Sequence, residues 1–119
     1  MIDLNELKKT TLEIGEKRIA NGANLNPDFL KHCAGELVEV VNARQEFKTC
    51  ESLIVSEVDT NETMVKRCKN LKTEYAHELA DIIVCVLNEA EVANIDIEKA
   101  IFEVVEKNRL RAEGKGDKK

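Results

Sequence analysis

Residues 74–90, with the sequence EYAHELADIIVCVLNEA, combine an apolar centre with two acidic side chains near the start. Glu78 and Asp81 are three positions apart, and residues at that spacing lie on one face of an α-helix. The run that follows Asp81 is as apolar as a buried helix. The segment therefore predicts a core helix that carries two carboxylates on one side.

The composition of the whole chain favours helices. Among 119 residues there are one Pro and five Gly, and aromatic residues make up 3%. Few breaks and few aromatic residues favour helices over a sandwich of short strands, and a chain of this length supports one modest core. We predict an all-α fold, an antiparallel helical bundle of about four main helices with a core completed by homo-oligomerisation. The domain is expected over residues 1–112, with a flexible charged tail at 113–119.

Three helices are indicated by apolar residues at helical spacing. The first is predicted from residue 2 to residue 19, before the interruption NGANLNPDF. The second is expected to begin near Pro27, with Asn26 as its cap, and to run through Phe47. The third is expected from Thr63 to Asn94 as the central rod of the fold.

A fourth helix follows Asp96, which is a predicted N-cap. Its inner face is expected to comprise Ile97, Ala100, Ile101, Val104 and Val105, and Phe29 and Phe102 are expected in the core. Residues 46–70 give the weakest signal, because TCESLIVSEV fits either a short helix or a strand and DTNET is typical of a loop before a helix.

A second acidic pair lies in the second predicted helix. Glu36 and Glu39 occur within GELVEVV, where their neighbours are apolar. Burying isolated carboxylates is costly unless they are protonated, paired with bases or bound to a cation. If the two helices pack face to face, Glu36, Glu39, Glu78 and Asp81 converge on an oxygen-rich site that suits Mg²⁺ or Mn²⁺. The alternative is that these acids lie on solvated faces.

The combination of GELVEVV with HELADIIVCVLNEAEVANIDIEKAIFEVVEKNRLR resembles the MazG-like family of all-α nucleoside triphosphate pyrophosphohydrolases. The match is best over residues 74–111 and good around 30–43. The resemblance implies a homodimer or homotetramer that uses a divalent metal to split a nucleoside triphosphate between its α- and β-phosphates. The base and sugar that it prefers are left open.

The resemblance assigns individual residues of this chain to the metal-binding positions of the family. Glu78 and Asp81 match the second metal-binding pair, and Glu36 matches the second Glu of the first pair. In that register the other carboxylate position falls on Cys33, so Glu39 or His32 is the alternative ligand.

The resemblance also implies phosphate contacts near the end of the last helix. Asn108 and Arg111 match its polar and basic positions, and Lys107 is a further candidate. The position where a Lys is common in the family is Val104 here, so Lys107 or Arg109 would supply that contact. One acidic side chain would act as general base for an attacking water molecule.

Two other functions fit parts of the sequence. Glu74 and His77 form the Glu-x-x-His motif of di-iron carboxylate bundles, but only one copy exists. A non-catalytic helical interaction module would carry the same acids on its surface.

The remaining features restrict partners and location. A formal net charge of −5 argues against nonspecific binding to nucleic acid or anionic membranes. The four cysteines form no CxxC pair and are expected to be reduced structural thiols. No apolar run approaches the ~18 residues that a membrane span needs, so a cytoplasmic protein is expected.

Overall fold

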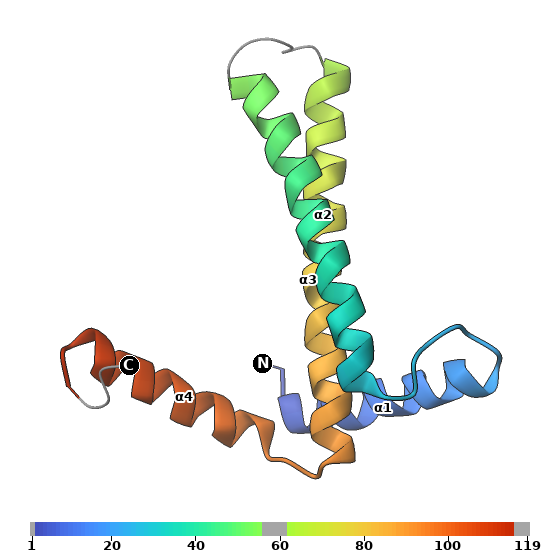
Figure 1. Ribbon diagram of the computed structural model, residues 1–119, viewed down its shortest axis with the longest axis vertical. Helices are drawn as coiled ribbons and strands as arrows, with labels where there is room; N and C mark the ends of the chain where they lie inside the picture. Colours follow the sequence, from blue (N-terminus) through green and yellow to red (C-terminus); the bar gives the residue numbers. More distant parts are fainter. Residues whose placement is uncertain (1, 56–61, 116–119) are drawn as a thin grey trace.

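The protein is built from helices alone over the residues that the computed structural model describes, which are 2–55 and 62–115. The helices are α1 (Leu4–Ala20), α2 (Phe29–Val55), α3 (Glu62–Val92) and α4 (Ile97–Ala112) (Figure 1). The predicted all-α fold with four main helices is confirmed. In the described ranges, no helix is both long enough and apolar enough to cross a membrane.

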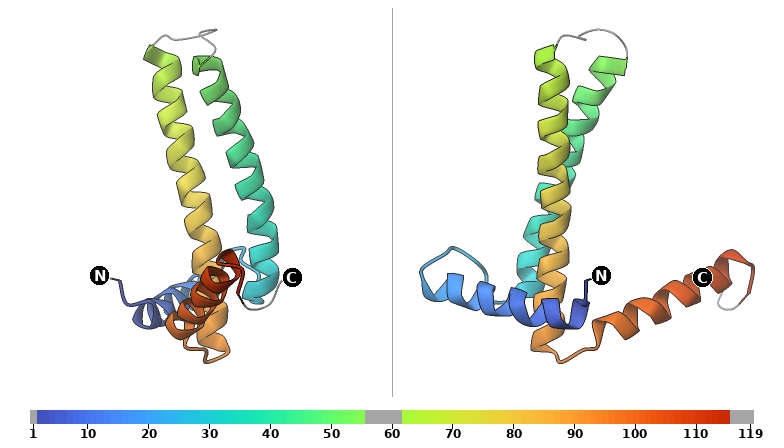
Figure 2. Two further views of the ribbon diagram at one scale, coloured as in Figure 1. Left: turned by 90° about the vertical axis from the view of Figure 1, so that its left-hand side faces the viewer. Right: turned by 180° about the vertical axis from the view of Figure 1, so that it is seen from behind.

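α2 and α3 form a long antiparallel hairpin, in which they lie side by side in every view (Figure 2). The upper part of the hairpin has a core of Phe47, Cys50 and Leu71, with Cys68 and Tyr75 packed against it. The rings of Phe47 and Tyr75 lie 6.1 Å apart between centroids. This apolar contact holds the two helices in the register that brings their acidic pairs together.

The ends of α2 and α3 differ in part from the predictions. α2 begins at Phe29, where the side chain of Asp28 accepts a hydrogen bond from the backbone N–H of Lys31. The prediction that Asn26 is the cap of this helix is therefore wrong. Asn26 instead accepts a hydrogen bond from the N–H of Asp28. α2 is then helical as far as Val55, which excludes a strand over residues 49–55.

The other predicted boundaries are closer to the structure. Glu62 begins α3, one residue before Thr63, and the rest of the predicted loop at 59–61 lies outside the described residues. Residues 113–115 of the predicted tail form the C-terminal cap of α4. Gly114 has a φ of 77°, and the N–H of Lys115 donates a hydrogen bond to the carbonyl of Leu110. Residues 116–119 lie outside the described residues.

α1 crosses the base of the hairpin and packs against α3 (Figure 1). Gly15 is at this contact, where a Cβ would lie 3.4 Å from Asn88 Nδ2 and 3.5 Å from Phe29 Cε1, which are ordinary van der Waals distances. Phe29 is buried, as predicted. A buried lysine also ties α1 to the end of α3: Lys8 Nζ donates to the carbonyl of Ile95 at 2.6 Å.

α4 starts from a polar junction with α1. Asp96 accepts a hydrogen bond from the backbone N–H of Lys99, which confirms it as the N-cap. Asn5 bridges the two helices, since its Nδ2 donates to Asp96 Oδ1 at 3.0 Å and its Oδ1 accepts from the N–H of Ile97 at 3.2 Å. The direction of α4 is therefore set by contacts with α1.

The expectation that α4 packs its apolar face into the core is wrong for the single chain. α4 projects sideways from the base of the hairpin (Figures 1 and 2). Asn94, with a φ of 56°, turns the chain before α4, so the helix does not fold back along α3. Ile101, Val104 and Val105 are exposed, and Phe102 is 66% exposed rather than in the core.

Candidate metal centre

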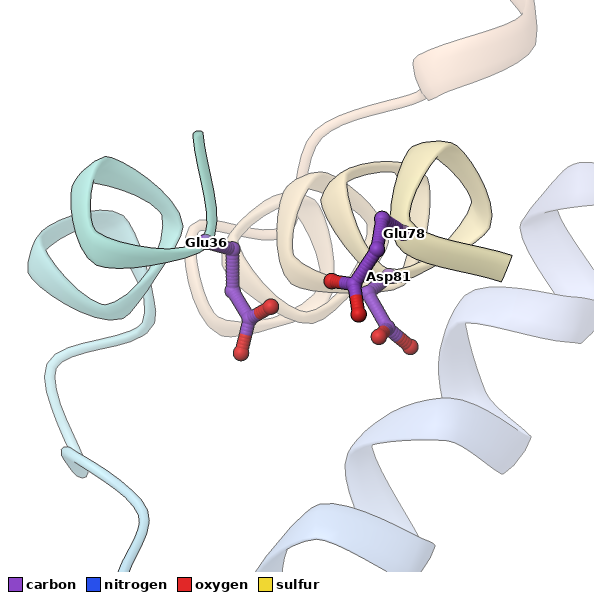
Figure 3. A group of neighbouring side chains, drawn as sticks. All are labelled: Glu36, Glu78 and Asp81. Carbon is purple, nitrogen blue, oxygen red and sulfur yellow. The ribbon is translucent and has the colours of Figure 1, made fainter. Parts of the chain in front are cut away.

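Three carboxylates from two helices meet in the lower half of the hairpin. Glu36 comes from α2, and Glu78 and Asp81 come from successive turns of α3 (Figure 3). One carboxylate oxygen of each residue lies within 4.8 Å of those of the other two. The i, i+3 spacing places the two α3 acids on one face, and the antiparallel pairing brings Glu36 opposite them. This cluster matches three of the four predicted metal ligands.

Glu39, the fourth predicted ligand, lies one turn after Glu36 and is more exposed. It is outside the set of three, yet its charge and its side-chain interaction raise the pKa values of both Glu36 and Glu78. Its carboxylate is therefore next to theirs. The structure brings all four predicted acids together, with Glu36 and Glu78 partly buried and Glu39 and Asp81 exposed.

Burial makes this concentration of negative charge unfavourable. Burial is the largest cause of the raised pKa of Glu36, followed by the charge of Glu39. The same two causes, in the same order, raise the pKa of Glu78. The Oε2 atoms of Glu36 and Glu78 are buried without a hydrogen-bond partner among the described residues. Such oxygens need a proton or a cation, so the donor set fits a divalent metal that prefers oxygen ligands.

His32 is the basic group next to the cluster. Its Nε2 lies 3.0 Å from Glu36 Oε1, and its positive charge, when present, lowers the pKa of Glu36 against the stronger raising effects of burial and Glu39. His32 is partly buried and touches one oxygen of Glu36, which leaves Oε2 as the oxygen without a partner. A contact of this kind can fix the orientation of the Glu36 carboxylate.

Two cysteines, Cys33 and Cys85, lie near the acids. Burial, then the charges of Cys33, Glu36 and Asp81, raise the pKa of Cys85 to about 11. A thiol with that pKa stays protonated at neutral pH and is a poor ligand for a hard cation. Cys33 lies close to Cys85 and is not in the set of three acids. Glu39 is outside the set as well, but its carboxylate acts on both Glu36 and Glu78, so among the open choices it is the oxygen ligand nearest to the cluster.

The predicted phosphate contacts lie elsewhere. Lys107, Asn108 and Arg111 are on α4, which leaves the base of the hairpin in another direction (Figure 1). Lys107 and Asn108 are exposed. The single chain does not bring these residues to the acids, so their contact with phosphate stays a prediction.

A cavity of about 270 Å³ adjoins the acids between α1, the start of α2 and α3. Glu36 and Asp81 line it at the metal cluster, and Phe29, His32 and Asn88 line it further on. Asn88 was not predicted as a site residue. The signal in the sequence is that it is the first amide side chain after the apolar run IIVCVL, at a position where α3 is buried.

A second, more open hollow of about 250 Å³ adjoins Glu39 and Glu78. Glu39 and Glu78 line it together with Glu46 and Glu74. Each hollow is therefore lined by two of the four predicted acids, and the second is strongly acidic.

Comparison with known proteins gives no match: no protein-family model, no curated protein and no solved structure is significantly similar to this chain.

Proposed function

We propose that this protein is a metal-dependent nucleoside triphosphate pyrophosphohydrolase, which releases a nucleoside monophosphate and pyrophosphate. The observation that carries the proposal is the cluster of Glu36, Glu78 and Asp81 with two buried carboxylate oxygens that lack partners, beside a cavity of about 270 Å³. The resemblance of these segments to the MazG-like family gives the reaction. Mg²⁺, or Mn²⁺, is the proposed cofactor.

The acids have distinct parts in this proposal. Glu36, Glu78 and Asp81 hold the cation, and Glu39 completes the site from its exposed edge. The bound cation would polarise the phosphorus under attack and offset the charge of the leaving pyrophosphate. One of these carboxylates would accept a proton from the attacking water as general base. The water oxygen bonds to the α-phosphorus as the bond to the bridging oxygen of pyrophosphate breaks.

The proposed assembly is a homodimer or homotetramer. Large apolar side chains are exposed on α2, where Leu30 and Val38 are 65% and 60% exposed, and on α4, where Phe102 is 66% exposed. A helix with an apolar face needs a surface to cover it, and a second copy has apolar faces of the same kind. In such an assembly α4 would bring Lys107, Asn108 and Arg111 to the phosphates of a nucleotide held by another copy.

The same exposed faces favour one alternative, a non-catalytic helical interaction module. The di-iron alternative has less support, because Glu74 and His77 are exposed and neither belongs to the acidic cluster. A product analysis separates the proposals. Incubation of nucleoside triphosphates with the protein and Mg²⁺, followed by ³¹P NMR, should show a monophosphate and pyrophosphate. A diphosphate with inorganic phosphate would place the cleavage at the wrong bond, and unchanged triphosphates would favour the interaction module.

A further inference from the structure

Asn88 has an unusual position for an amide side chain. It is 5% exposed on α3, and its Oδ1 is buried without a hydrogen-bond partner among the described residues. An unpaired buried carbonyl oxygen destabilises the folded state by roughly 1–3 kcal/mol. Such a group calls for an explanation, and a bound partner that donates a hydrogen bond to it is one.

Asn88 lines the cavity next to the acids, where a ligand could pair with it. Asn88 lines this cavity together with the buried Phe29, and the polar side chains of the lining also include Thr11, Arg18, Asn26 and His32. The volume of about 270 Å³ is near the lower end of ligand sites, which is roughly 300 Å³. The Phe29 ring and the buried acceptor of Asn88 in one cavity suit a flat heterocycle that carries an N–H group.

The spacing along α3 gives the distance between Asn88 and the acidic cluster. Asp81 and Asn88 both line the cavity and are seven residues apart, two helical turns or about 10 Å along the axis. A ligand in the cavity would therefore have one end at the acids and the other at Asn88. A nucleotide has this layout, with phosphates at one end and a flat base at the other.

We propose that this cavity binds the nucleobase of the substrate and that Asn88 Oδ1 accepts a hydrogen bond from an N–H group on the edge of the base. The inference rests on the proposed function, and it makes Asn88 a specificity-determining residue with no part in the chemical step. Bases that lack the N–H group leave Oδ1 unpaired in the complex, so they are bound less tightly.

The test compares matched substrates and matched variants. The triphosphate that the wild-type protein hydrolyses best is compared with its analogue without the N–H group, for example purine riboside triphosphate in place of ATP or 3-methyluridine triphosphate in place of UTP. Asn88→Leu has nearly the same size and no acceptor, and Asn88→Asp keeps an acceptor. Asn70→Leu is the control, because Asn70 is an exposed amide on the same helix and does not line the cavity.

The expected result is a loss of discrimination. Wild type and Asn70→Leu should prefer the normal base over the analogue by at least about 10-fold in kcat/KM, mainly through KM, and Asn88→Leu should prefer it by less than about 3-fold. Asn88→Asp should keep part of the preference. The thermal stability of Asn88→Leu should be unchanged or higher, whereas a purely structural Asn88 would make it fall.

The other outcomes separate this inference from the proposed function. Equal discrimination by wild type and Asn88→Leu, with Mg²⁺-dependent hydrolysis intact, would overturn the inference and leave the function standing. If the wild-type protein hydrolyses no triphosphate, the proposed function is refuted. Calorimetry with nucleoside monophosphates then tests whether the cavity binds a nucleobase. Binding that Asn88→Leu abolishes would then retain the base pocket, and absence of binding would refute it.

Discussion

His32 Nε2 lies 3.0 Å from Glu36 Oε1, one helical turn away on α2. The contact involves one oxygen of the carboxylate, while the other, Oε2, is buried and has no partner among the described residues. His32 therefore fixes the side chain whose free oxygen is proposed to bind the metal.

Replacing His32 should weaken metal binding. Groups that orient a metal ligand typically contribute 10–100-fold to affinity, so His32→Ala should raise the Kd for Mn²⁺ by about that factor in a calorimetric titration. His77→Ala is the matched control, because His77 is exposed on α3 and outside the cluster. Equal affinities for the two variants would show that His32 does not position Glu36.

The acids should make the metal-free protein more stable at lower pH. Burial and then Glu39 raise the pKa values of Glu36 and Glu78 above 4.5, so the folded state holds protons that the unfolded state has released. Their contribution to stability is fully present below pH 4.5 and is lost as the pH rises through the folded-state pKa values. Urea unfolding in EDTA between pH 4.5 and 8 should show this decline.

Glu78→Gln should flatten that pH dependence and raise the free energy of unfolding at pH 7 in EDTA. The variant removes a buried charge beside the other acids, whereas Glu103→Gln, on the exposed surface of α4, should change neither quantity. Saturating Mg²⁺ should stabilise the wild type and not Glu78→Gln. A parallel response to Mg²⁺ in both proteins would argue against Glu78 as a ligand.

Lys8 should be important for stability. Its Nζ is buried, donates to the carbonyl of Ile95 and lies 3.6 Å from Glu91 Oε2. Lys8→Met should lower the free energy of unfolding by roughly 2–3 kcal/mol, because it leaves a carbonyl and a carboxylate without their cation. Lys9→Met removes only an exposed contact with Glu6 and should change it by less than about 0.5 kcal/mol.

Cys85 should react slowly with alkylating reagents. Its pKa of about 11 lies two units above the ordinary value of 9.0, so at pH 8 the thiolate is roughly 100-fold scarcer than in the unfolded chain. Mass spectrometry after iodoacetamide treatment should show at least that decrease in rate for the native protein. Similar rates for native and urea-unfolded protein would mean that Cys85 is not buried beside the acids.

The acidic centre was predictable because the information is local. Two acids three residues apart share a helix face in any helix. Their apolar neighbours were a poorer guide to burial, because Val38 and Ile83 are 60% and 57% exposed and Asp81 is exposed as well. The pairing of α2 with α3 then follows from their lengths and apolar faces. This is why Glu36, Glu39, Glu78 and Asp81 converge as the sequence predicts.

The course of α4 was not predictable, because it depends on distant contacts. The apolar face of the helix suggests burial, but the chain turns at Asn94 and the helix start is held by Asn5 of α1. Asn88 was missed for a similar reason. A single amide after an apolar run marks a site only once a cavity is seen beside it.

The most direct test of the central proposal is pyrophosphate release from a panel of canonical and modified nucleoside triphosphates, with Mg²⁺ and with EDTA. Wild type and Glu103→Gln should release pyrophosphate only with Mg²⁺. Glu78→Gln, folded as judged by circular dichroism, should lose at least about 100-fold in kcat/KM. Equal release by Glu78→Gln, or release that EDTA does not stop, would contradict the proposal that these acids form the metal centre of a pyrophosphohydrolase.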